Sequence, residues 1–295
     1  MPFNNVSDYA DYRSEGAWHQ ASYLRTSSPI VGIQGRWTDM SIGAGQPTYN
    51  AYGGTPLTAT PLTNNTNLAV YTGPAPGAGK TKHLHSLTAD ITGTTAAPST
   101  FILSDYLLHY PFVDLDDVSE QTFTNIETLP RYTDGEGLAC FVVCLVPTTA
   151  VNTNALCTLK YTNSAGTSNR TTNFALLGST VIGSLLCAGN DSTAATSTQA
   201  SPFIPLAAGD TGIRSIESIT MSAGMGGLAT FVICNPLASI PIFTSITQTE
   251  KTFFSRTGRA PEIIDGAFLH FLACNGGSAG PTFGTFRSSL TFVWG

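Results

Sequence analysis

Gly137-Leu-Ala-Cys-Phe-Val-Val-Cys-Leu-Val-Pro147 recurs later in the chain, with few changes, as Gly227-Leu-Ala-Thr-Phe-Val-Ile-Cys-Asn-Pro236. Each copy begins with glycine, continues with β-branched, aromatic and other apolar residues, and ends at a proline that cannot donate to a sheet ladder. The stretch from Leu138 to Val146 has no polar position, so neighbouring structure must cover both faces of the strand. The repeated stretch therefore predicts two buried strands in one wall of a β-sandwich or at a subunit interface.

Short strand-like runs occupy much of the remaining chain, and Gly, Asn, Pro and Ser separate them without any helical period. We predict strands at residues 67–72, 83–91, 100–109, 137–147, 155–161, 174–186, 213–222, 227–236, 240–246, 266–274 and 288–294. This spacing predicts an all-β fold, either a jelly-roll-like β-sandwich or two related sandwiches.

The N-terminal part of the chain differs from the rest in composition. Residues 1–65 are rich in Asn, Ser, Gly, Tyr and Pro and contain few apolar runs. We predict that they form an extended arm with short strands at most, either lying along a neighbouring subunit or poorly ordered. Residues 66–295 then form the sandwich body; in the alternative of two sandwiches, the body divides near residues 190–200.

The balance of charge points to a surface that other chains cover. Charged residues make up 11% of the sequence, against about 25% in an average soluble domain. A β-sheet surface that is polar but nearly uncharged suits contact with copies of the same chain or with another protein. We therefore expect an assembling protein.

Nucleic acid and membranes are not expected partners. The net charge is −6, and the 13 basic residues are scattered, whereas a nucleic-acid groove needs them on one face. No apolar run approaches the length of a membrane span, and the first residues lack the pattern of a signal peptide. We expect a protein made in a cytoplasm.

The cysteines are expected to be small buried apolar residues. They lie mostly in apolar strand runs and lack the paired spacing of a metal site. The six are Cys140, Cys144, Cys157, Cys187, Cys234 and Cys274.

A glycine-rich segment from Gly73 to Thr81 resembles a phosphate-binding loop. Pro74 occupies the position of the first glycine of that motif, and Pro76 lacks an amide donor for phosphate. The residues that follow have a strand pattern where the motif needs a helix. We do not expect nucleotide binding.

A second segment, Gly276-Gly-Ser-Ala-Gly280, matches the spacing of a nucleophile elbow. Such an elbow leads into a helix and is followed by a histidine. Pro281 follows here instead, and the last histidine is His270. We interpret the segment as a turn and expect no catalytic residue.

Two groups of side chains are weak metal candidates. Asp114, Asp116 and Asp117 could hold a calcium ion, but the full spacing of a calcium loop is missing, and a solvated loop is the favoured interpretation. His83 and His85 share a strand face without an evident third ligand. We expect neither a bound metal nor a cofactor.

Several longer phrases are similar to a family of structural proteins of the tailed-bacteriophage virion. The phrases are Gly35-Arg-Trp-Thr-Asp39, Gly43-Ala-Gly-Gln-Pro-Thr-Tyr-Asn-Ala-Tyr52, Tyr110-Pro-Phe112 with Glu120-Gln121, Leu129-Pro-Arg-Tyr-Thr-Asp-Gly135, and Phe203-Ile-Pro-Leu-Ala-Ala-Gly-Asp-Thr-Gly-Ile-Arg-Ser215. The resemblance covers roughly residues 35 to 236. It implies a component of the particle and brings no enzymatic residue with it.

From the resemblance we expect a decoration protein that cements the capsid surface, with a tail or fibre-associated protein binding a host receptor as the alternative. Its partners would be copies of itself, as a trimer by analogy of fold, and the major capsid protein or another virion protein. We expect contacts through Trp37, Tyr49, Tyr52 and Arg131. Arg131 would face Asp134 or a carboxylate of a neighbouring subunit, unless its turn is purely structural.

Overall fold

The computed structural model describes residues 15–26, 35–64, 67–92, 98–149, 154–188, 199, 201–245, 247–253, 260–276 and 284–295. Antiparallel strands dominate these residues, and the short 3-10 helix η1 (Met40–Ile42) is the one helix among them. The strands form three sheets that pack face to face around apolar cores. The expected all-β sandwich class is therefore confirmed.

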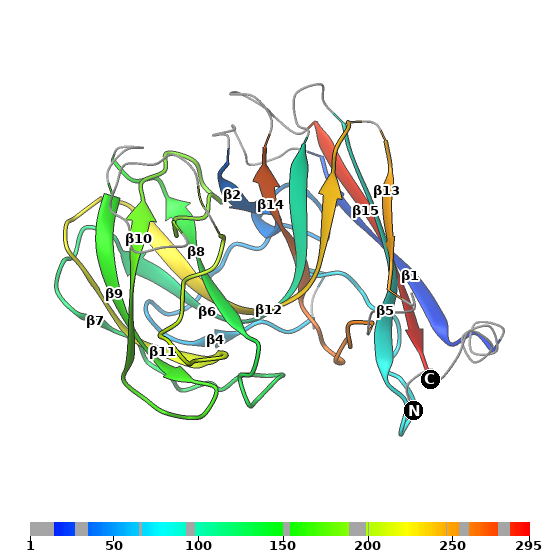
Figure 1. The fold of residues 1–295 in the computed structure, drawn as a ribbon, viewed down its shortest axis with the longest axis horizontal. Helices are drawn as coiled ribbons and strands as arrows, with labels where there is room; N and C mark the ends of the chain where they lie inside the picture. Colours follow the sequence, from blue (N-terminus) through cyan, green and yellow to red (C-terminus); the bar gives the residue numbers. More distant parts are fainter. Residues whose placement is uncertain are drawn as a thin grey trace.

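A six-stranded sheet lies between the other two sheets. It contains β2 (Trp37–Asp39), β14 (Leu269–Asn275), β6 (Ser99–Asp114), β12 (Leu228–Ile242) and β8 (Ala139–Val146), with β4 (Thr60–Pro61) paired to β6. The five-stranded sheet contains β13 (Thr249–Thr252), β5 (Lys82–Thr92), β15 (Thr285–Trp294), β1 (Trp18–Arg25) and β3 (Gly45–Gln46). The four-stranded sheet contains β10 (Arg170–Leu177), β9 (Asn154–Asn163), β11 (Ile213–Met221) and β7 (Gln121–Thr122). In Figure 1 the four-stranded sheet is on the left and the five-stranded sheet on the right, with β6 and β12 running between them.

The long strands β6 and β12 join two sandwiches into one body. They pair with each other from Leu228 opposite Asp114 to Ile242 opposite Ser99. One half of this ribbon packs on the four-stranded sheet and the other half on the five-stranded sheet. The two sandwiches therefore share a wall, and neither is built from a separate part of the chain.

Three large apolar clusters fill the body, beside a small one of Ala175, Leu177 and Ala188, and alternation along the strands helps to separate them. Phe231 lies in the first cluster and its neighbour Val232 in the third, because successive side chains point to opposite faces of a sheet. The first cluster includes Leu108, Tyr110, Phe123, Leu159, Phe174, Ile216 and Phe231. The second includes Tyr23, Leu87, Phe101, Ile240, Phe271, Phe286 and Phe292. The third includes Trp37, Tyr52, Tyr106, Phe141, Val232 and Phe268.

The repeated stretches form neighbouring strands in the six-stranded sheet, as predicted. β8 pairs with the first half of β12, so that Val142 lies opposite Phe231 and Phe141 opposite Val232. All four of these side chains are completely buried. Burying each one contributes about 1.5–3 kcal/mol to the free energy of unfolding, which makes this pair of strands a large part of the stability.

Some predicted strand limits were wrong. Pro147 follows the end of β8, but Pro236 does not end β12, which continues to Ile242. The register against β6 shifts between Pro236 and Ala238, and this bulge accommodates a residue without an N–H. The predicted strand at 240–246 is thus partly the end of β12. Residues 67–72 form a loop whose apolar side chains are partly buried.

Part of the segment predicted as an extended arm belongs to the body. β1 pairs with β15 along its whole length, from Trp18 opposite Val293 to Arg25 opposite Phe286. Tyr23 reaches the second cluster, while Gln20 and Ser22 on the other face are exposed. Residues 1–14 and 27–34 lie outside the described residues, as does nearly all of the segment 190–200. The strand orders do not establish a jelly roll, which stays a prediction.

Candidate functional site

Trp37 and Tyr52, two of the predicted interaction residues, lie inside the molecule beside a buried carboxylate. Asp39 caps η1, and its Oδ1 accepts the Ser41 N–H at 2.8 Å and the Tyr106 hydroxyl at 2.9 Å. Its Oδ2 accepts the Tyr52 hydroxyl at 2.5 Å. Burial raises the pKa of the Asp39 carboxyl, and the hydrogen bonds from Ser41 and Tyr52 act in the opposite direction. This centre fixes residues 37–52 on the sheet, so its aromatic side chains are not surface contacts.

Arg131 also has an internal partner. Its Nε donates to Asp105 Oδ2 at 2.9 Å and its Nη2 to Asp105 Oδ1 at 2.7 Å, and both side chains are almost fully buried. Arg131 Nη2 also donates to the Leu62 carbonyl oxygen at 3.0 Å. The predicted pairing of Arg131 with Asp134 is wrong, because the carboxylate of Asp105 inside β6 would otherwise be buried without a counter-charge. Of the four predicted interaction residues only Tyr49, 48% exposed, is on the surface.

The weak metal candidates do not converge. Asp114 Oδ1 accepts the Asp116 N–H at 2.9 Å and Asp117 Oδ1 accepts the Ser119 N–H at 2.9 Å, so both carboxylates stabilise their own loop. His83 is buried and lies 3.3 Å from the Ala260 carbonyl oxygen. Over the described ranges, no group of three His, Cys, Asp or Glu side chains could hold a metal ion.

The other sequence motifs have structural explanations where they are described. Lys82 begins strand β5, so no helix follows the glycine-rich segment at 73–81. Most of the segment 276–280 lies outside the described residues. Five cysteines are buried and Cys274 is half-buried, all as free thiols. Burial raises the pKa of the Cys144 thiol to about 12, in agreement with the expected role as small buried side chains.

A surface hollow of about 390 Å³ lies on the sandwich that the four-stranded and six-stranded sheets form. We call it the rim hollow; it is lined by Asn125, Glu127, Thr128, Leu129, Thr133, Thr162, Arg214 and Ser215. Hydrogen bonds fix its walls: Asn125 accepts the Tyr110 hydroxyl at 2.8 Å and donates to the Ile216 carbonyl oxygen at 2.7 Å. Arg214 Nε donates to the Asp134 carbonyl oxygen at 3.0 Å. The hollow is thus a fixed feature of the surface.

Two glycines bring the walls of the rim hollow together. Gly135 has φ +72°, and a Cβ there would lie 2.7 Å from Arg214 Cγ. A Cβ on Gly212 would lie 2.0 Å from the Gly135 carbonyl oxygen. Only glycine permits this approach. Residues 129–135 and 203–215, two of the phrases that resemble virion proteins, therefore pack against each other at this place.

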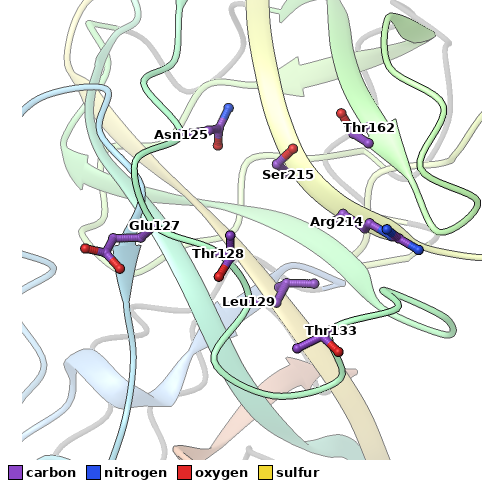
Figure 2. Close-up of a pocket in the computed structure, with 8 residues that line it drawn as sticks. All are labelled: Asn125, Glu127, Thr128, Leu129, Thr133, Thr162, Arg214 and Ser215. Atoms are coloured by element: carbon purple, nitrogen blue, oxygen red, sulfur yellow. The ribbon is translucent and has the colours of Figure 1, made fainter.

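Apolar and hydroxyl-bearing side chains lie in the middle of the rim hollow, and charged side chains lie at its sides. Figure 2 shows Glu127 and Arg214 on opposite sides, both extending away from the middle, with Thr128, Leu129 and Ser215 between them. Ile126, between two lining residues in sequence, is 72% exposed. No charged group is aimed into the hollow, so it suits a contact with a polar and apolar protein surface better than an anionic ligand.

A second hollow of about 380 Å³ lies on the outer face of the five-stranded sheet. We call it the sheet-face hollow; it is lined by Trp18, Gln20, His85, Ser86, Thr88, Gln248, Glu250, Ser289 and Thr291. Three adjacent strands place Gln20, Thr291 and Ser86 in one row, because Gln20 lies opposite Thr291 and Thr291 opposite Ser86. The next row contains Ser289, Thr88 and, on β13, Glu250.

Sequence reasoning missed both hollows. The alternation of Trp18, Gln20 and Ser22 with buried residues was a detectable strand signal, but the low apolar content of residues 1–65 concealed it. The rows of the sheet-face hollow depend on the register of β1 against β15, strands at opposite ends of the sequence. No local pattern predicts such a register.

No family model matches the chain, and no curated protein matches it. The similarity to virion proteins therefore depends on the phrases themselves. Among the described residues, no helix is sufficiently long and apolar to span a membrane.

Proposed function

We propose that the protein is a non-enzymatic structural component of a tailed-bacteriophage particle, a decoration protein that binds the outside of the capsid. The observation that carries this proposal is the rim hollow. Two of the phrases similar to virion proteins, residues 129–135 and 203–215, meet there, and the exposed Ile126 lies in sequence between two of the lining residues. The partner is the major capsid protein or another virion protein, and copies of the chain associate with each other, as a trimer by analogy of fold.

The composition of the rim hollow supports a protein contact. Interfaces between proteins have an apolar centre and a polar rim, and a few anchor side chains contribute most of the binding free energy. Here Leu129 lies in the middle, and Glu127 and Arg214 at the edge carry opposite charges. Ile126 is an apolar anchor that a hydrophobic pocket of the shell would bury. Repetition of this contact over many copies gives firm attachment from weak single contacts.

The placement of the buried ionisable groups supports a non-enzymatic role. Asp39 and Asp105 are bound by several internal donors, and His109 and His270 are buried in strands. Burial lowers the pKa of His109 to about 4, so this imidazole is neutral at neutral pH. Asp39 and Asp105 hold loops to the sheet, and none of these four groups lines either hollow.

The test compares Ile126→Asp with the matched control Phe243→Asp. Both wild-type side chains are apolar and 72% exposed, and only Ile126 is next in sequence to residues that line the rim hollow. Particles assembled with each variant are purified, and the copies per particle are counted by quantitative mass spectrometry. We expect on the order of hundreds of wild-type copies, at least a tenfold loss for Ile126→Asp and no loss for Phe243→Asp.

Equal incorporation of the two variants would contradict the role of the rim hollow. A wild-type chain absent from purified particles would contradict the whole proposal. A count of a few dozen copies would favour the alternative, a tail or fibre-associated protein that binds a host receptor. Sedimentation of the purified protein tests self-association, since a monomer at all concentrations would remove that part of the proposal.

A further inference from the structure

We propose that the sheet-face hollow is a binding site for a neutral saccharide. This activity goes beyond attachment to a particle and does not rest on it, because the hollow lies on the five-stranded sheet and the rim hollow lies on the other sandwich.

The dimensions suit a small ring-shaped ligand. The volume of about 380 Å³ is near the lower end of the range of about 300–1,000 Å³ that is typical of small-molecule sites. Neighbouring strands in a sheet are about 4.8 Å apart, and alternate residues on one strand are about 6.5 Å apart. The two rows of side chains therefore form a grid of polar groups on the scale of the hydroxyls around a sugar ring.

The chemistry of the lining selects a ligand that is rich in hydroxyl groups and uncharged. Hydroxyls and amides both donate and accept hydrogen bonds, as sugar hydroxyls do, and Glu250 accepts them. No lysine or arginine lines the hollow to pair with a phosphate or carboxylate, and the charge of Glu250 repels anions. A lone carboxylate without other strong oxygen ligands is a poor site for a hard cation.

Trp18 supplies an apolar surface at the edge of this polar grid. Its side chain is 37% exposed, so part of the indole is accessible to a ligand. One face of a pyranose ring presents C–H groups, which pack on an indole while the ring's hydroxyls point outward to polar partners. A tryptophan beside Gln20, Thr88 and Glu250 offers both kinds of contact at once.

Several polar groups in the hollow are not hydrogen-bonded to another described side chain. Gln20 Nε2 donates to Ser289 Oγ at 2.7 Å. Among the described residues, the hydroxyls of Ser86, Thr88 and Thr291 and the carboxylate of Glu250 make no hydrogen bond to another side chain. A sugar that replaces the water on these groups keeps their hydrogen bonds, and it gains the contact with the indole.

The experiment measures the binding of maltose, cellobiose, lactose and chitobiose to the full chain, with digalacturonic acid as the charged probe. The chain has three tryptophans, of which Trp37 and Trp294 are 8% exposed, so a change in fluorescence on binding reports mainly Trp18. Calorimetry measures the affinity independently. We expect millimolar binding of at least one neutral disaccharide and at least tenfold weaker binding of digalacturonic acid.

Three variants locate the site. Trp18→Ala and Thr88→Lys should each weaken binding at least tenfold, and Ile126→Asp should leave it unchanged. Thr88→Lys changes a partly exposed strand residue, and a thermal midpoint close to the wild-type value confirms that the variant is folded. No binding of any neutral probe, or binding that both hollow variants retain, would overturn the proposal. Particle attachment by Thr88→Lys is expected to be normal, so failure of this site and failure of the rim hollow are distinguishable.

Discussion

The four-stranded and five-stranded sheets have similar polar residues and use them differently. On the four-stranded sheet, Thr158 donates to Asn173 at 2.9 Å, and Lys160 Nζ donates to Glu120 at 2.7 Å. On the outer face of the five-stranded sheet, Gln20 and Ser289 form such a pair, while several hydroxyls nearby bond to no other described side chain. Polar side chains of the four-stranded sheet hydrogen-bond to each other, whereas several on the five-stranded sheet are accessible to water or a ligand. A composition rich in Thr and Ser therefore does not by itself indicate a contact surface.

The pairs on the four-stranded sheet also differ in strength among themselves. Lys160 and Glu120 are 40% and 47% exposed, and an exposed ion pair of this kind adds little to stability. The carboxylate of Asp210 is only 4% exposed and lies at the end of the sheet, next to the first residues of β10 and β11. It joins Arg170 on β10 to Tyr161 and Asn163 on β9.

The largest effect is expected for Asp210→Ala. The carboxylate accepts hydrogen bonds from Arg170 Nε at 2.9 Å, the Tyr161 hydroxyl at 2.5 Å and Asn163 Nδ2 at 2.7 Å. Its removal leaves three donors without their acceptor, so we expect the free energy of unfolding to fall by about 3 kcal/mol. Chemical denaturation measures it. A decrease of less than about 0.5 kcal/mol would mean that the hydrogen bonds of Asp210 contribute little to stability.

The pKa of Asp210 predicts that the unfolding free energies of wild type and Asp210→Asn depend differently on pH. The hydrogen bond from Arg170 lowers the pKa of Asp210 from 3.8 to about 2, and the bonds from Tyr161 and Asn163 act in the same direction. A carboxyl group whose pKa is lower in the folded protein stabilises fully above its unfolded value and loses that contribution as the pH falls through about 2. The difference in unfolding free energy between wild type and Asp210→Asn should therefore shrink between pH 4 and pH 2. A constant difference over this range would show that the charge of Asp210 is not responsible.

Elements with a consistent local signal could be predicted from the sequence, and elements set by register could not. The first repeated stretch has no polar position from Leu138 to Val146, so its burial in a sheet followed from composition alone. β12 continued past Pro236 because a bulge against β6 absorbed the missing N–H, and only the partner strand reveals that bulge. Ala69 and Val70 are buried in a loop, which gives the same composition as a strand.

The candidate sites were less predictable than the fold. Trp37, Tyr52 and Arg131 are conspicuous in sequence because large aromatic and charged residues often mediate contacts. In this fold Trp37 is buried in the third cluster, and Tyr52 and Arg131 are bound to Asp39 and Asp105, carboxylates that only the tertiary structure places beside them. The lining of each hollow comes from three or four separate segments of the chain. A small residue such as Ser289 can be recognised as part of a site only when its neighbours in the structure are known.

The smallest predicted effect compares two cross-strand pairs by double-mutant cycles. Thr158 lies opposite Asn173 and is hydrogen-bonded to it, whereas Thr88 lies opposite Ser289 without such a bond. Replacing each residue by alanine, singly and together, isolates the coupling energy of each pair. We expect about 0.5 kcal/mol for Thr158 with Asn173 and a value near zero for Thr88 with Ser289. Equal coupling energies in the two pairs would mean that side chains on the outer face of the five-stranded sheet also hydrogen-bond to each other. That result would contradict the assignment of a ligand to this face.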